Sequence, residues 1–303
     1  MEVLERYESF IDDPAAFYEA CQRPLPSVVR VNTIKATTAR AREALEAEGV
    51  EVDPAEWHPE LFRFPGDQAG ANWPYFHGWI HGQEEVSAVP ARVLDPQPGE
   101  RVWDACAAPG SKTTQLSALM DDTGTVVATD NNLGRISALR SNTERLGVTN
   151  GTLTNEDARN HSLKPFDGAI YDRALVDVPC SCEGTIRKNP DVLEDWERSH
   201  VEGTAGVQKG ILRRAVQVTR KGGTVVYSTC TFAPEENEAV LEYALEEEPC
   251  ELVDAEIPLE TRPGVTEWQG ETFDESVRRA RRIYPHLNDT GGFFCAKLAV
   301  TGE

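Results

Sequence analysis

Two patterns of apolar and polar residues divide the chain near residue 78. Before that point, the periodicities predict a helix over Pro14–Gln22, a strand over Ser27–Asn32, a helix over Thr37–Glu48 and a strand over Val50–Glu56. This order of elements is typical of a small α+β domain. The stretch from Gly66 to Gly82 is rich in glycine, proline and aromatic residues, which indicates a linker.

After the linker, short apolar strands alternate with amphipathic helices. The predicted strands cover Arg101–Cys106, Gly124–Asp130, Gly151–Thr154, Arg173–Val178, Thr224–Ser228 and Phe293–Val300. The predicted helices cover Lys112–Met120, Leu133–Leu146 and Gly206–Thr219. Such alternation predicts parallel βαβ units, and therefore an α/β fold with a Rossmann-like, doubly wound sheet. We predict a small α+β domain over residues 1–78 and the Rossmann-like domain over residues 79–303.

Polar or reactive residues follow four of the predicted strands. They are Asp104–Lys112, Asp130, Asp177–Cys180 and Ser228–Cys230. Doubly wound sheets bind their ligands beyond the carboxyl ends of the strands. We therefore expect these four segments to form one site.

The first of these segments is suited to a nucleoside cofactor. The loop from Cys106 to Lys112 consists mainly of small residues, which let a ligand approach the backbone at a helix N-terminus. Asp130, about 20 residues beyond Gly110, can accept hydrogen bonds from ribose hydroxyls, and Asp157 from an adenine amino group. A single aspartate at a strand end is often only a helix cap. Because neither G-x-x-x-x-G-K-[ST] nor G-x-G-x-x-G occurs, ATP hydrolysis and dinucleotide binding are disfavoured.

The seven cysteines indicate reduced thiols, because their number is odd and their spacing forms no regular framework. Cys180-x-Cys182 is too tight for the usual zinc knuckle, and we predict no metal site. Cys180 and Cys230 end strands that we expect to be neighbours. A partly exposed thiolate at such a place is suited to chemistry, although a buried, inert role is the alternative for any cysteine.

Charge and hydropathy indicate the cellular environment of the protein. Of the 303 residues, 30 are basic and 51 acidic, giving a formal charge of −21, and lysines are few. Such a surface favours a salt-rich cytoplasm, as in a halophilic archaeon. The acidic start and the lack of a long apolar run predict a cytoplasmic protein without a membrane span.

Several motifs together resemble the Nol/Nop/Sun (RsmB-like) family of RNA cytosine-5 methyltransferases. The resemblance runs from about Arg30 to Lys297. It rests on Arg30–Lys35, Gly82–Ser87, Asp104–Thr113, Asp177–Gly184, Tyr227–Glu238 and Gly291–Lys297. It implies a methyltransferase domain that uses S-adenosyl-L-methionine, preceded by a small RNA-recognition-like module. Ser111 departs from the family, which usually has a glycine there.

The resemblance also implies a mechanism and a set of site residues. The thiolate of Cys230 adds to carbon 6 of cytosine, and Asp177 holds or protonates the ring nitrogen. Cys180 helps to remove the carbon 5 proton, and Lys112 contacts the base or steadies the nucleophile. The implied cofactor residues are Cys106, Ala107, Ala108, Pro109, Gly110, Ser111, Lys112, Asp130, Arg135, Asp157 and Asp177.

The nucleophile and the function each have an alternative assignment. DNA cytosine-5 methyltransferases use the cysteine of a Pro-Cys motif, which would make Cys180 the nucleophile, whereas Ser-Thr-Cys-Thr at Cys230 favours the arrangement of the RNA family. A DNA methyltransferase and a catalytically idle RNA-binding or ribosome-assembly factor are the rival functions. We expect a monomer acting on transfer or ribosomal RNA, without a membrane or a metal as partner.

The net charge opposes an RNA partner, so local basic clusters have to provide the contacts. Arginines gather at Arg278, Arg279, Arg281 and Arg282, and three basic pairs stand at Arg187-Lys188, Arg213-Arg214 and Arg220-Lys221. If the segment around Arg278 is helical, some of its arginines can contact phosphate. A solvated helix face is the plainer interpretation of this run.

Overall fold

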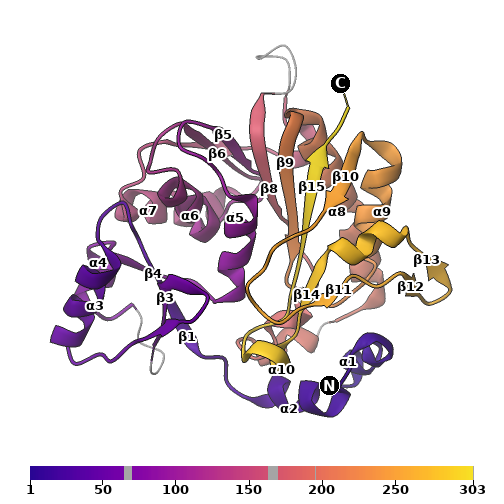
Figure 1. Cartoon of the computed structure of the whole chain (residues 1–303), viewed down its shortest axis with the longest axis horizontal. Helices are drawn as coiled ribbons and strands as arrows, with labels where there is room; N and C mark the ends of the chain where they lie inside the picture. The colour runs from indigo at the N-terminus through magenta and orange to yellow at the C-terminus, as the bar shows by residue number, and fades with distance from the viewer. Residues whose placement is uncertain (65–69, 163–169, 195, 303) are drawn as a thin grey trace.

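The computed structural model describes residues 1–64, 70–162, 170–194 and 196–302. A four-stranded sheet and a nine-stranded sheet organise the chain, and Figure 1 shows them side by side. Within the described ranges, no helix is long and apolar enough to cross a membrane.

The four-stranded sheet is antiparallel and has the order β2-β3-β1-β4. Its strands are β1 (Ser27–Val31), β2 (Asp53–Ala55), β3 (His58–Phe64) and β4 (Ile80–Gly82). The helix α3 (Thr38–Ala47) packs Ala41 and Leu45 against this sheet, and α4 (Trp73–Phe76) lies beside it. The prediction of a linker over Gly66–Gly82 is therefore wrong from residue 70 onward, because α4 and β4 belong to this small unit. Its residues 66–69 lie outside the described residues.

The nine-stranded sheet is mixed and has the order β11-β14-β15-β9-β8-β5-β6-β7, with β10 paired to β15. Strands β5 to β9 are parallel, and β15 runs antiparallel to β9. Their bounds are β5 (Arg101–Asp104), β6 (Thr125–Asp130), β7 (Gly151–Asn155), β8 (Tyr171–Asp177), β9 (Thr219–Thr229), β10 (Cys250–Val253), β11 (Arg262–Pro263), β14 (Arg281–Ile283) and β15 (Phe293–Val300). The predicted α/β fold is confirmed.

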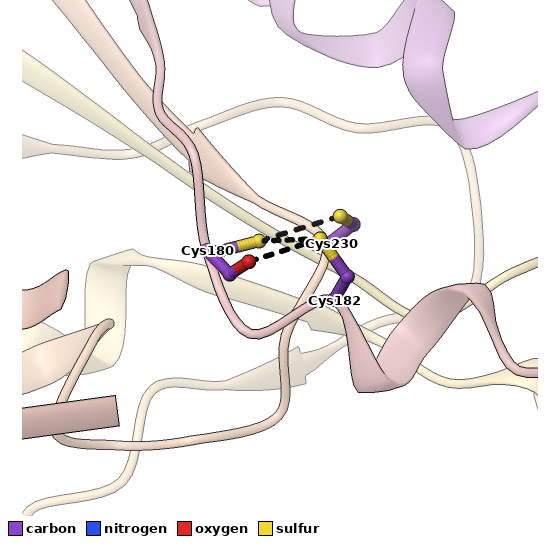
Figure 2. Close-up of side chains that lie close together, drawn as sticks. All are labelled: Cys180, Cys182 and Cys230. Carbon is purple, nitrogen blue, oxygen red and sulfur yellow. Dashed lines mark hydrogen bonds between the residues drawn. The ribbon is translucent and has the colours of Figure 1, made fainter. Parts of the chain in front are cut away.

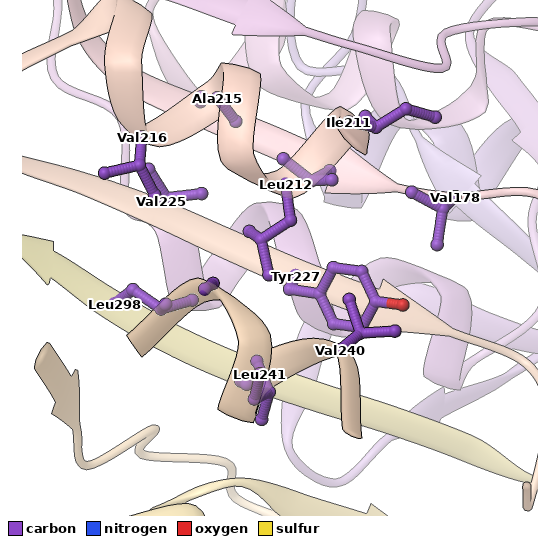
Figure 3. Close-up of a cluster of buried hydrophobic side chains, with 14 of the residues drawn as sticks. Val178, Ile211, Leu212, Ala215, Val216, Val225, Tyr227, Val240, Leu241 and Leu298 are labelled. Atoms are coloured by element: carbon purple, nitrogen blue, oxygen red, sulfur yellow. The ribbon is translucent and has the colours of Figure 1, made fainter. Parts of the chain in front are cut away.

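Helices cover both faces of the large sheet. One face carries α8 (Arg198–Val218) and α9 (Glu238–Glu247), whose apolar residues pack on Tyr227 and Leu298 in the main core (Figure 3). The other face carries α5 (Val89–Leu94), α6 (Ser111–Leu119) and α7 (Leu133–Leu146). Helix α9 and strand β3 were not predicted, and β9 begins five residues earlier than its apolar run.

The first 22 residues lie on the large unit rather than on the small sheet. Helix α2 (Pro14–Gln22), which follows the short α1 (Glu2–Glu5), lies next to α10 (Pro285–Asn288) in Figure 1. Tyr7 and Phe17 are fully buried in one cluster with Phe232 and Tyr284. The hairpin of β12 (Glu267–Trp268) and β13 (Glu271–Thr272) adds Trp268 to it. The proposed domain boundary at residues 78 and 79 stays a prediction.

Candidate functional site

Strands β8 and β9 end together at one edge of the large sheet. Asp177, the last residue of β8, pairs in register with Ser228 of β9. The Ser228 hydroxyl donates a hydrogen bond of 2.7 Å to Oδ1 of Asp177. Because the strands are parallel and in register, the loops that follow them leave the sheet at the same place. This brings the residues after Asp177 and those after Thr229 into contact.

Three cysteine sulfurs meet between these two loops (Figure 2). The Sγ of Cys180 lies 3.3 Å from that of Cys230 and 3.7 Å from that of Cys182. All three sulfurs lie within 4.8 Å of one another, a spacing that a metal ion could bridge. The prediction of no metal site rests on the Cys180–Cys182 spacing in the sequence. In the folded chain, the Cys230 sulfur lies beside the sulfurs of that pair.

Hydrogen bonds among the three thiols, together with their burial, determine the pKa values of these cysteines. The pKa of Cys180 is raised well above its ordinary value by its hydrogen bonds to Cys182 and Cys230 and by burial. The Cys180 contact lowers the pKa of Cys230, but Cys182 and burial outweigh it, and the pKa of Cys230 is also raised. The pKa of Cys182 is instead lowered to about 3 by its hydrogen bonds to Cys180 and Cys230, so the one negative charge of the cluster lies on Cys182 near neutral pH.

Lys112 stands beside this cluster, on the first turn of α6. Its Nζ lies 2.8 Å from Oδ2 of Asp177 and 2.9 Å from the Ser87 hydroxyl. Burial lowers the pKa of Lys112, but the attraction of Asp177 outweighs it, so that the pKa is raised overall. The side chain therefore stays a cation, and its charge also acts on Cys230.

A cavity of about 200 Å³ opens onto these groups. Lys112, Asp177 and Cys230 line it, together with Glu84 and the exposed Lys188. Cys180 is not among the lining residues, but its sulfur contacts that of Cys230, which is. The structure thus brings together all four predicted catalytic residues, Cys230, Cys180, Asp177 and Lys112.

The predicted cofactor loop runs from β5 to α6. Gly110 precedes the helix at φ +108°, where a Cβ would meet Leu139 Cδ1 at 2.9 Å. Ser111, at the position where the family usually has glycine, contacts His81 Nε2 at 2.9 Å through its hydroxyl. Ala107 and Ala108 are buried against Leu139. The loop is closely packed and its side chains are small, and its binding of a cofactor stays a prediction.

The two carboxylates predicted to hold a nucleoside have different surroundings. Asp130 is buried at the end of β6, and its carboxylate accepts hydrogen bonds from the amides of Ala108 and Asn132 and pairs with Arg135. The Asp157 carboxylate instead accepts from the amide and the guanidinium of Arg159, which lowers its pKa. Asp157 thus caps a short turn, which is the alternative role for an aspartate at a strand end.

The charges around the loop fit a cationic methyl donor with a nucleoside. Burial raises the pKa of Cys106, and Asp104, Asp177 and Asp130 raise it further, so three carboxylates face this loop. Oδ1 of Asp104 is buried without a hydrogen-bond partner among the described residues, and burial raises the pKa of Asp104 to about 7. S-adenosylmethionine carries a sulfonium cation and ribose hydroxyls, which suit such acceptors. The prediction missed Asp104, although this residue begins the loop motif.

The basic clusters expected to contact RNA are mostly paired internally. The segment around Arg278 is a short 3₁₀ helix followed by β14, and Arg282 is fully buried in an ion pair with Glu238. Arg278, Arg281, Arg213 and Arg220 form ion pairs with Glu275, Asp254, Glu248 and Asp172. Arg187 is buried and donates to carbonyl oxygens. A phosphate contact by the exposed Arg278 stays a prediction, whereas Arg282 is too deeply buried to make one. Lys188 is the cluster residue that lines the cavity.

Comparisons with known proteins agree with this architecture. Residues 91–299 match the family model described as 16S rRNA methyltransferase RsmB/F. The chain is 36% identical over 299 residues to the tRNA (cytosine(49)-C(5))-methyltransferase of Pyrococcus abyssi, covering 98% of this chain and 94% of that protein. It is 35% identical to the ribosomal RNA small subunit methyltransferase F of Shewanella loihica, covering 93% of this chain but only 58% of that protein. A methyltransferase homolog protein from Pyrococcus horikoshii has the same fold, with a TM-score of 0.85 and 32% identity over 98% of this chain and 94% of that one.

Proposed function

This chain belongs to the RsmB/F family of RNA cytosine-C5 methyltransferases, which depend on S-adenosylmethionine, and we propose that it methylates a transfer RNA through a covalent adduct on Cys230. The observation that carries this proposal is the meeting of Cys230, Asp177 and Lys112 around one cavity, with the Cys180 sulfur 3.3 Å from that of Cys230. The choice of transfer RNA is supported by the relative whose length this chain nearly matches, the tRNA methyltransferase of Pyrococcus abyssi.

The first step is the addition of Cys230 to carbon 6 of a cytosine in the cavity. The proton of Cys230 passes to the thiolate of Cys182, whose sulfur lies within 4.8 Å of that of Cys230. The new S–C6 bond pushes the electron pair of the C5–C6 double bond toward the ring carbonyl. The cationic Lys112 then stabilises the negative charge that develops at ring nitrogen 3 and the adjacent oxygen, and Asp177 holds the ring by accepting a hydrogen bond from the amino group at carbon 4.

Carbon 5 of the resulting enamine is nucleophilic, and the bound S-adenosylmethionine supplies the methyl group that it takes up. Cys180 then gives its own proton to water in the cavity, and the resulting thiolate removes the proton from carbon 5. The electron pair of that C–H bond re-forms the C5–C6 double bond, and Cys230 leaves as a thiolate. This assignment gives the two cysteines different tasks, although their sulfurs are neighbours.

We also propose a path for the rest of the RNA strand. A second cavity of about 470 Å³ shares Leu25, Glu84 and Lys188 with the cavity of the cysteines. Pro24 to Val28 and Gly82 line it from the small unit, and Arg187 lines it from the large one. Lys188 is exposed and makes no ion pair with any described residue, so its ammonium group is free to contact a phosphate. We therefore place the nucleotide next to the target cytosine here, in a strand whose target base is unstacked.

Two cysteine variants test the chemistry. Cys230→Ser forms no covalent RNA adduct, because it lacks the sulfur that adds to carbon 6. Cys180→Ser adds and methylates but releases slowly, so it accumulates the adduct in denaturing gels. The reverse gel pattern would make Cys180 the nucleophile. RNA binding without adduct or methyl transfer in the unaltered protein would favour an RNA-binding role instead.

The substrate is tested separately. Bisulfite sequencing of transfer and ribosomal RNA from a strain that lacks the gene shows which cytosine loses its protection. We expect the missing methyl group in transfer RNA. A loss confined to ribosomal RNA would overturn the choice of substrate and leave the chemistry standing.

A further inference from the structure

A buried polar network lies behind the two cysteine loops and joins them. Ser181, which follows Cys180, and Thr231, which follows Cys230, place their hydroxyl oxygens 3.0 Å apart. Two carboxylates, Glu183 and Glu236, contact these hydroxyls. These four side chains are all buried, and none of them lines the cavity of the cysteines.

The network holds the Cys180 loop on both sides of the thiol. Gln208 of α8 donates to the carbonyl oxygen of Pro179 at 2.8 Å and to Oε2 of Glu236 at 2.7 Å. The amide of Ser181 donates to Glu236, at 3.2 Å to Oε2. The backbone adds a tie to the other loop, because the amide of Gly184 donates to the Cys230 carbonyl at 2.9 Å. The position of Cys180 relative to Cys230 thus depends on Glu236 and its partners.

The number of protons available to this network indicates whether the Glu236 carboxyl group is ionised or neutral. Glu183 accepts from Tyr7 and Trp196 at Oε1, and its Oε2 contacts the hydroxyls of Ser181 and Thr231. An ionised carboxylate can accept about four hydrogen bonds, so these four donors fill its capacity. Each hydroxyl group has a single proton to donate, and these bonds use it. The Ser181 oxygen nevertheless also contacts Oε1 of Glu236. That contact needs a further proton, and we assign it to Glu236 because Glu183 already accepts from four donors.

We propose that Glu236 is a neutral carboxylic acid and a positioning residue that sets the spacing of the Cys180 and Cys230 thiols. This inference rests on the proposed function. Its proton is donated to Ser181, whose own proton is donated to Glu183. The two loops are thereby joined through one chain of hydrogen bonds. Ionising Glu236 would place two like charges across Ser181 and break this chain.

The titration of Glu236 agrees with the geometry. Burial and, after it, the repulsion of Glu183 raise the pKa of Glu236 to about 8, although its hydrogen bonds with Ser181 and Gln208 oppose the shift. The other titratable or charged groups nearby are Tyr7, Tyr227, whose hydroxyl donates to the Glu236 carbonyl, Cys180 and the Arg6–Glu235 ion pair. The neutral state holds below about pH 8 and is lost above it, so the alignment of the thiols fails on the alkaline side.

The test is the pH profile of kcat for Glu236→Gln, Glu236→Ala and a neighbouring control, Glu235→Gln. In the glutamine variant, the amide nitrogen donates to Ser181 and the amide oxygen accepts from Gln208, as the neutral acid does. We expect the unaltered enzyme and the control to lose kcat above about pH 8, whereas Glu236→Gln keeps it. We expect Glu236→Ala to lose about 100-fold in kcat at pH 7, the effect of a misplacement of about 1 Å.

A second readout does not depend on methyl transfer. Oxidation by the azo reagent diamide joins Cys180 to Cys230, and mass spectrometry measures the rate of this disulfide. We expect the rate at pH 7 to be unchanged in Glu236→Gln and at least about tenfold lower in Glu236→Ala, because thiol exchange requires close sulfurs. An alkaline loss of kcat in Glu236→Gln equal to that of the unaltered enzyme overturns the inference. So does rapid oxidation of Glu236→Ala. An unaltered protein that makes no 5-methylcytosine refutes the proposed function alone, because the disulfide rates still test the positioning.

Discussion

Gly184 joins the Cys180 loop to both the Cys230 loop and β15 through the backbone. Its amide donates to the carbonyl of Cys230, and its carbonyl accepts from the amide of Gly292 at 2.8 Å. A Cβ at Gly184 would lie 2.3 Å from the Gly292 oxygen and 2.8 Å from the Cys230 oxygen. All of these neighbours are backbone atoms, so no side chain can rotate away. The change Gly184→Ala therefore tests how closely the site depends on the spacing of these loops.

The size of the effect follows from the contact. Ordinary contact begins at 3.4 Å, so the loops have to separate by 3.4 − 2.3 = 1.1 Å at Gly292. A misplacement of about 1 Å in reacting groups costs roughly 100-fold in rate. Overpacking of this kind destabilises by about 1–3 kcal/mol. We expect Gly184→Ala to fold and to bind RNA, but with kcat reduced about 100-fold.

The assay measures methyl transfer to RNA under single-turnover conditions, with the free energy of unfolding measured in parallel. Gly206→Ala is the matched control, because no atom lies within 4 Å of its Cβ position inside α8. Alanine there stabilises the helix by about 0.8–1.0 kcal/mol, and the rate stays unchanged. A folded Gly184→Ala protein with kcat within about threefold of the unaltered enzyme would refute the reasoning, because the magnitude rests on displacement of the loops.

Three further predictions concern charge. Arg282→Met leaves the fully buried Glu238 without its cation, and we expect a loss of about 3–5 kcal/mol in the free energy of unfolding, measured by denaturant titration. Lys188→Ala lowers the slope of log K against log salt for single-stranded RNA by about 0.7, whereas Lys221→Ala, distant from the cavity, leaves it unchanged. The pKa of Asp104 is raised from 3.8 to about 7, so the folded state holds one more proton between these values. Stability therefore falls as pH rises through that window, by at most about 1.4 kcal/mol per unit, and Asp104→Asn reduces this slope in unfolding titrations at pH 5 and 7.

The main elements of the catalytic unit could be predicted from the sequence. Strand β15 and helix α7 have the predicted bounds, and the segments that end β5, β6, β8 and β9 all carry the expected polar residues. Local periodicity determines such elements, because burial on one face repeats every two or 3.6 residues. Parallel pairing then brings the ends of the strands to one edge, and this is why the four candidate catalytic residues meet.

Tertiary packing decided which charges are free and which partners the thiols have. Arg282 and Lys188 both stand in basic clusters of the sequence, yet one is buried against Glu238 and the other lines the cavity. Glu236 carried no individual signal, because its partner Ser181 lies 55 residues away in the chain. Hydrogen bonds and ion pairs between distant segments depend on how helices and sheets dock, which a local pattern of residues does not encode. The chemistry could therefore be predicted from short motifs, whereas the spacing and the protons of its groups are properties of the folded chain.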